Sequence, residues 1–139
     1  MTNLEYNMKN KVIKAYTDLE QSKKLAEILP LESADMCFAN DGTAIKIDAN
    51  SYNVRKLMWK DYVVEVIPCW SLAALRSCLP PGISIDGILY VFESHNTFDN
   101  MWVYEYKFED ISAPLYSKSL NEIDAAIDMI IQLKENKMI

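Results

Sequence analysis

The stretch ILYVFESHNTFDNMWVYEY, residues 88–106, contains two runs of apolar and aromatic residues separated by a polar segment. Aromatic side chains recur at every second position in both runs, as in a strand whose alternate residues share one face. The polar segment has the length of a hairpin loop, so the strands 88–93 and 101–106 are predicted to pair antiparallel. This hairpin places an antiparallel sheet at the centre of the predicted fold.

A second hairpin is predicted upstream. Residues 36–39 and 44–48 are short strand-like runs, and Asn40-Asp41-Gly42-Thr43 lies between them. Asp-Gly favours a hairpin turn, because glycine accepts the positive φ that the turn requires. Residues 62–67, rich in β-branched side chains, are predicted to form a further strand.

Three helices are predicted around these strands. The first begins at Thr17-Asp18-Leu19-Glu20, which has the spacing of a capping box, and ends before Pro30. A short helix over 72–79 begins after Ser71. The last begins at a second capping box, Ser119-Leu120-Asn121-Glu122. Its inward positions are Leu120, Ile123, Ile127 and Ile130, and its outward positions are Asp124, Asp128 and Glu135.

The resulting order, α-ββ-β-α-ββ-α, predicts an α+β fold with a mostly antiparallel sheet of about five strands and three helices. The chain has 139 residues, half of them hydrophobic, so residues 1–139 are expected to form a single domain. Residues 12–16 are compatible with either a strand or a helix, and residues 1–16 are expected to be variable or loosely ordered.

Composition excludes several classes of protein. No apolar run is long enough to span a membrane, and the N-terminus lacks the apolar core of a signal peptide. Cys37, Cys69 and Cys78 form no C-x-x-C pair, which argues against a disulfide framework and a zinc site and favours reduced thiols in the cytoplasm. The net charge of −6 makes nucleic acid an unfavourable partner.

Few residues suggest catalysis. His95, the only histidine, lies in the predicted loop, and Cys69 lies just before a helix, where a thiolate is favoured. Glu93, Asp99 and Glu105 are acids that could pair across the predicted hairpin, but exposed acids are common in hairpins, so this signal is weak. No nucleotide-binding, hydrolase or metalloprotease motif is present, so we expect no catalytic residue, no metal and no cofactor.

The aromatic stripe of Trp102, Tyr104 and Tyr106 is the most suggestive feature. If it faces the helices it forms the core, which is the favoured interpretation; if it faces outward it marks a partner surface. A weaker alternative is Arg55, Lys56, Trp59 and Lys60, which interleave basic and aromatic residues and would bind nucleic acid if joined by Lys9, Lys11 and Lys14.

Four stretches of the chain are similar to stretches of a known family. They are residues 21–36 (QSKKLAEILPLESADM), residues 67–80 (IPCWSLAALRSCLP), the strand at Trp102-Val103-Tyr104 and the helix over 124–133. Together they resemble a family of short uncharacterised proteins of gut Bacteroidales, their prophages and mobile elements. The resemblance covers most of the chain beyond about the first fifteen residues. It implies a cytoplasmic bacterial or phage accessory protein and no particular catalytic residue.

We therefore expect a non-enzymatic accessory protein that binds another macromolecule, either a protein partner or a second copy of itself. The alternatives are a small enzyme that uses Cys69 or the His95 loop, and a weak nucleic-acid-associated protein that uses the basic stretch.

Overall fold

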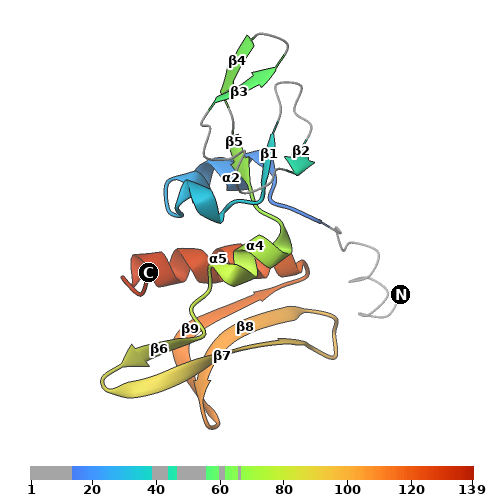
Figure 1. Ribbon diagram of the computed structural model, residues 1–139. Helices are drawn as coiled ribbons and strands as arrows, with labels where there is room; N and C mark the ends of the chain where they lie inside the picture. Colours follow the sequence, from blue (N-terminus) through green and yellow to red (C-terminus); the bar gives the residue numbers. More distant parts are fainter. Residues whose placement is uncertain (1–13, 39–43, 47–55, 60–61, 66) are drawn as a thin grey trace. The chain divides into compact units, whose positions relative to one another are not determined.

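The computed structural model describes residues 14–38, 44–46, 56–59, 62–65 and 67–139 (Figure 1). The chain divides into two compact units. We call residues 15–78 the N-terminal unit, and residues 79–139, to which Lys14 also belongs, the C-terminal unit. In the described residues, no helix is long and apolar enough to cross a membrane.

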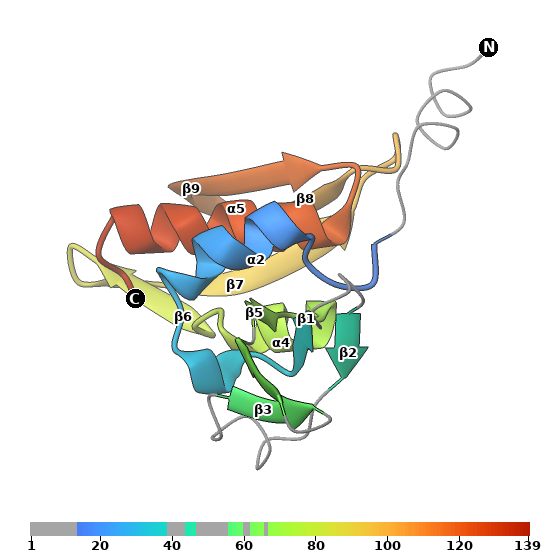
Figure 2. The same ribbon diagram turned by 90° about the horizontal axis from the view of Figure 1, so that it is seen from above.

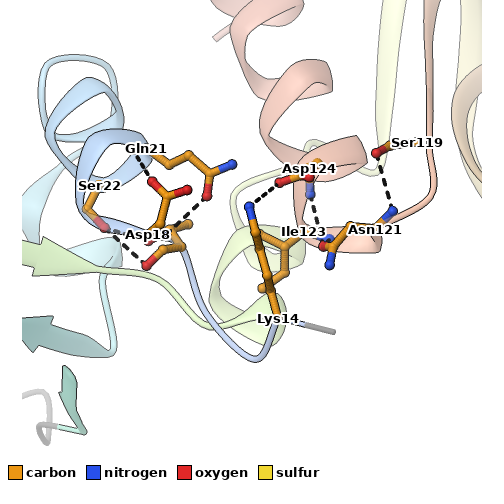
Figure 3. Close-up of polar contacts among 9 residues, drawn as sticks. Lys14, Asp18, Gln21, Ser22, Ser119, Asn121, Ile123 and Asp124 are labelled. Carbon is orange, nitrogen blue, oxygen red and sulfur yellow. Dashed lines mark hydrogen bonds and ion pairs between the residues drawn. The ribbon is translucent and has the colours of Figure 1, made fainter. Parts of the chain in front are cut away.

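Two α-helices and a 3-10 turn belong to the N-terminal unit: α2 (Leu19–Ala26), η1 (Leu31–Ser33) and α4 (Leu72–Ser77). Ser71 caps α4, as its sequence predicts. The prediction that Thr17 caps α2 is wrong by one residue. Asp18 is the cap, and its carboxylate accepts a hydrogen bond from the Gln21 amide at 2.8 Å while the Gln21 side chain accepts one from the Asp18 amide (Figure 3).

The strands of the N-terminal unit form two small antiparallel sheets. β1 (Met36–Phe38) pairs with β2 (Ala44–Lys46) and with β5 (Ile67–Cys69), which gives the order β2-β1-β5. β3 (Lys56–Trp59) pairs with β4 (Tyr62–Glu65) as a separate hairpin. The β1–β2 pairing confirms the predicted hairpin, although its turn residues lie outside the described part of the chain.

The core of the N-terminal unit forms around fully buried Leu25, Trp70 and Leu75. Thr17 is buried with them, because its hydroxyl accepts the Trp70 amide at 3.1 Å and contacts the Ser22 hydroxyl at 2.7 Å. The Thr17 hydroxyl is thus already engaged in the core, which explains why the helix cap falls to Asp18.

The C-terminal unit is a four-stranded antiparallel sheet in the order β6-β7-β8-β9. Its strands are β6 (Gly82–Ile85), β7 (Ile88–Asn96), β8 (Trp102–Phe108) and β9 (Ile111–Ser119). The helix α5 (Glu122–Glu135) lies along one face of this sheet (Figure 2). The registers of the β7–β8 pair, with Phe92 opposite Tyr106 and Ser94 opposite Tyr104, confirm the hairpin predicted over 88–106.

Helix α5 buries three of the four apolar side chains that its sequence pattern places inward, and the fourth, Leu120, is half-buried just before the helix begins. Ile123, Ile127 and Ile130 are all buried, as predicted. The cap is Asn121 rather than the predicted Ser119: the Asn121 side chain accepts the Ile123 amide at 2.9 Å, and the Ser119 hydroxyl accepts the Asn121 amide (Figure 3).

The α+β class and the order of the predicted elements are confirmed. The structure adds four strands to the five predicted ones, namely β3, β5, β6 and β9, and the described strands belong to three sheets.

Candidate contact surface

The aromatic stripe on β8 lies in the core of the C-terminal unit. Tyr104 and Tyr106 are 0% exposed, and both rings pack against Phe92 at centroid distances of 5.2 and 5.5 Å. The Tyr104 hydroxyl donates to Glu122 of α5 at 2.8 Å, so this side of the sheet faces the helix. Tyr104 and Tyr106 are therefore unable to serve as a partner surface, and Trp102 is half-buried beside them.

Cys69 is placed where a nucleophile would be ineffective. Its side chain is fully buried, and its sulfur lies 3.6 Å from the Thr17 hydroxyl and 3.4 Å from the Thr17 carbonyl oxygen. Burial raises the pKa of the Cys69 thiol, which favours the unreactive protonated form. His95 belongs to the other unit, where it is exposed on β7 opposite Val103.

Two of the three hairpin acids do meet. Glu93 and Glu105 are directly opposite each other on β7 and β8, and Lys107 Nζ lies 3.8 Å from one carboxylate and 3.7 Å from the other. The Ser112 hydroxyl also donates to Glu105, at 3.1 Å. Asp99 instead accepts a hydrogen bond from the Thr97 hydroxyl, which lowers the pKa of its carboxyl. These contacts give all three acids structural partners.

The basic stretch is described only in part. Lys56 and Trp59 are the end residues of β3, opposite Glu65 and Tyr62, while Arg55, Lys60, Lys9 and Lys11 lie outside the described residues. Lys14 Nζ forms an ion pair with Asp124 at 2.9 Å, in the first turn of α5 (Figure 3). The Lys14 charge is therefore already paired with an acid. Within the described residues, no group of three or more His, Cys, Asp or Glu side chains is placed to hold a metal ion.

Two hairpin turns lie at the same end of the C-terminal sheet. The β6–β7 turn is Asp86-Gly87, and the β8–β9 turn is Glu109-Asp110. Because Val91 of β7 is opposite Lys107 of β8, the beginning of β7 and the end of β8 are neighbours, and so are the turns attached to them. The other end of the sheet carries the β7–β8 loop.

Five large apolar side chains are exposed at this end of the sheet. They are Ile88, Leu89 and Val91 on β7, Phe108 on β8 and Ile111 on β9, with exposed fractions between 40% and 59%. We call these five residues the hairpin-end surface. Exposed apolar side chains that form a contiguous patch mark partner-binding sites in folded proteins.

The hairpin-end surface includes residues from both faces of the sheet. Leu89 and Val91 alternate with Tyr90 and Phe92, so they point away from the face that α5 covers. The Leu89 side chain also packs on Gly82, because a Cβ atom built at position 82 would lie only 3.0 Å from Leu89 Cδ1. This glycine therefore leaves room for the leucine to lie close to the backbone of β6.

The other three residues lie on the side of the sheet that faces α5 but remain exposed. Phe108 is opposite Ile111, and its ring makes an edge contact with Tyr90 at 6.5 Å. Ile88, Phe108 and Ile111 keep at least 40% of their surface accessible, so α5 leaves this end of the sheet uncovered.

The turns place acidic side chains around the hairpin-end surface. Asp86, Glu109 and Asp110 are all exposed, and neither turn contains a basic residue. Asp86 and Gly87 both have positive φ, at 53° and 82°, as a tight two-residue hairpin requires. The surface is therefore apolar with an acidic rim.

Sequence reasoning identified β7 and β8 but neither β9, which carries Ile111, nor the surface itself. The Asp86-Gly87 dipeptide between Ile85 and Ile88 was the available signal, since it predicts a tight hairpin as Asp41-Gly42 does.

Comparison of the chain with protein-family models, with curated proteins and with solved structures gives no match.

Proposed function

We propose that this protein is a non-enzymatic accessory protein that acts by binding a protein partner through the hairpin-end surface. The observation that carries the proposal is the grouping of five exposed large apolar side chains at one end of the C-terminal sheet. Leaving these side chains in water is unfavourable, and a partner that covered them would gain the free energy of their burial.

The placement of the chemically reactive side chains supports a binding function over a catalytic one. Cys69 is buried, with a raised pKa, and Glu93 and Glu105 share the positive charge of Lys107. A general acid or base needs a perturbed proton affinity in an accessible pocket, and a nucleophile needs access to its substrate. These residues act instead as parts of the core and of the sheet.

The acidic rim indicates the chemistry of the partner. Two copies that met through this surface would bring Asp86, Glu109 and Asp110 of each copy together, and like charges at an interface are unfavourable. Nucleic acid would be repelled for the same reason. The partner we propose is therefore a protein that presents apolar side chains together with Lys or Arg. The resemblance noted above would place it in the cytoplasm of a bacterium that carries a phage or mobile element.

Site-specific photo-crosslinking in the native host tests this proposal. A photoreactive phenylalanine analogue replaces Ile111 in one variant and Phe98 in a control variant. Phe98 is a fully exposed apolar residue in the loop at the opposite end of the sheet, so it matches Ile111 in chemistry but lies outside the proposed surface.

We expect a discrete crosslinked product at position 111, none at position 98, and loss of the product when Leu89→Ser is added. A crosslink between two copies of the chain would contradict the choice of partner. Equal products at both positions, or a product that Leu89→Ser leaves unchanged, would contradict the proposed surface.

A further inference from the structure

The side chain of Gln132 in α5 binds the backbone of β9. Its Nε2 atom donates to the Tyr116 carbonyl oxygen at 2.8 Å, and its Oε1 atom accepts from the Tyr116 amide at 3.2 Å. One carboxamide therefore satisfies the donor and the acceptor of a single strand residue. In an antiparallel sheet, a residue of a neighbouring strand makes this same pair of hydrogen bonds.

Tyr116 lies on the outer strand of the sheet. β9 pairs with β8 on one side, and in the described part of the chain no strand pairs with its other side. Tyr116 is opposite Glu105 in the β8–β9 register, but its own backbone groups bond to Gln132 and so point away from β8. An open strand edge of this kind readily accepts a strand from another molecule.

The orientation of the Gln132 carboxamide is fixed by a third contact. Its Nε2 atom also donates to Asp128 Oδ2, one turn earlier in α5, at 2.9 Å. Both hydrogens of the carboxamide are thus used. Rotating the carboxamide by half a turn would place its nitrogen next to the Tyr116 amide, another donor, and its oxygen next to the Tyr116 carbonyl oxygen and Asp128 Oδ2, two acceptors. The contact with Asp128 therefore holds Gln132 in the orientation that matches the strand.

Other features of β9 discourage strand addition. Pro114 lacks an amide hydrogen, Lys118 is exposed, and the pairing with β8 contains a bulge between Glu105 and Lys107. Proline, lysine and bulges are the devices by which natural edge strands avoid pairing with other chains. In addition to these features, the Gln132 side chain directly occupies the backbone groups of Tyr116 at this edge.

We infer that Gln132 substitutes for a fifth strand and closes the β9 edge against β9 of a second copy of this chain. A second copy is the relevant occupant, because every copy presents the same nine-residue strand at the same edge. This closure is independent of the hairpin-end surface and holds whether or not that surface binds a partner.

The experiment compares the wild-type chain with Gln132→Leu and with a matched control, Lys134→Leu. Both substitutions add a leucine to the C-terminal part of α5, but only the first removes the two bonds to Tyr116. Hydrogen exchange at the Tyr116 amide reports whether the edge is open, and light scattering over a range of concentrations reports association. Gln132→Ala repeats the test with a smaller side chain in case the leucine variant folds poorly.

We expect the Tyr116 amide to exchange about two- to tenfold faster in the Gln132 variants, given the usual strength of a hydrogen bond. We also expect those variants to dimerise at concentrations where the wild type and Lys134→Leu stay monomeric. Unchanged exchange at Tyr116 would overturn the inference, and so would faster exchange in a chain that stays monomeric.

Discussion

Glu93 and Glu105 are directly opposite each other across β7 and β8, with the Lys107 ammonium within 3.8 Å of both carboxylates. Two like charges at paired positions destabilise an antiparallel sheet. Glu105 is also buried, which adds the cost of removing a charge from water. Lys107 and the Ser112 hydroxyl offset these costs, so the three charged side chains act as one unit.

Removing Lys107 is expected to destabilise the fold through Glu105. Lys107→Met leaves a buried carboxylate without its cation and should lower the free energy of unfolding by about 1–3 kcal/mol. Adding Glu105→Gln should restore most of the loss, because the charge that needs the lysine is then gone. Urea unfolding measures both effects. Lys118→Met, an exposed lysine on β9, is the control and should change stability by less than about 0.5 kcal/mol.

The packing of α5 gives a second prediction. Ile130 is fully buried, and Ile127 is nearly so, beneath this helix. Changing either residue to Ala should cost about 2–5 kcal/mol through lost burial and the remaining cavity. Glu135→Ala, on the exposed side of the same helix, should be nearly neutral. A loss below 2 kcal/mol by thermal or urea unfolding would show that α5 is peripheral to the fold.

The thiols give a third prediction. Burial raises the pKa of Cys37, Cys69 and Cys78, so all three are protonated at neutral pH and should react slowly with a thiol reagent. Cys78, which is only half-buried, should react first, and Cys69 only when the N-terminal unit opens. Mass spectrometry of the labelled chain gives the order. Rapid stoichiometric labelling of Cys69 at neutral pH would instead favour the enzyme hypothesis.

Tyr106 predicts how stability changes in alkali. Burial raises the pKa of its hydroxyl far above the ordinary value, and the hydroxyl donates to the Pro80 carbonyl oxygen at 2.8 Å. The folded state holds this proton more tightly than the unfolded state. The contribution of Tyr106 to the free energy of unfolding is therefore complete below about pH 10, and it is lost as the pH rises toward the pKa of Tyr106 in the folded state.

Tyr106→Phe removes both the hydrogen bond and this titration. At pH 8 it should cost about 0.5–1.5 kcal/mol. Above pH 10 the difference between variant and wild type should shrink, because the wild type alone pays for keeping a buried phenol protonated. Urea unfolding at the two pH values measures the difference, and a constant difference would contradict a titrating role for Tyr106.

The sequence predicts the parts of this fold that rest on strong local signals. The β7–β8 hairpin was predictable because its apolar runs are long and a polar loop separates them. β9 was not, because Pro114 and three serines make residues 111–119 look like a linker. An edge strand tolerates proline, because the proline nitrogen, which carries no hydrogen, can face away from the neighbouring strand. Only the pairing with β8 shows that these residues form a strand.

The helix caps and the contact surface depend on tertiary structure in a similar way. Thr17 and Asp18 are both good caps, and the choice between them follows from the hydrogen bond that the Trp70 amide gives to Thr17. The five residues of the hairpin-end surface are ordinary strand residues in sequence. The exposure of Ile88, Phe108 and Ile111 depends on how far α5 extends over the sheet, and that of Leu89 and Val91 depends on what covers the opposite face. No local sequence pattern records either.

Tyr104 separates the two interpretations of the aromatic stripe in solution. The structure buries its ring completely against Phe92, and its hydroxyl binds Glu122. Tyr104→Ser should therefore lower the free energy of unfolding by about 3–5 kcal/mol through loss of the ring, whereas Tyr104→Phe should cost only about 0.5–1.5 kcal/mol for the hydrogen bond. Calorimetry and light scattering on the same samples provide the measurement. A Tyr104→Ser chain that kept the wild-type melting temperature but lost self-association would show that this ring contacts a second molecule rather than the core.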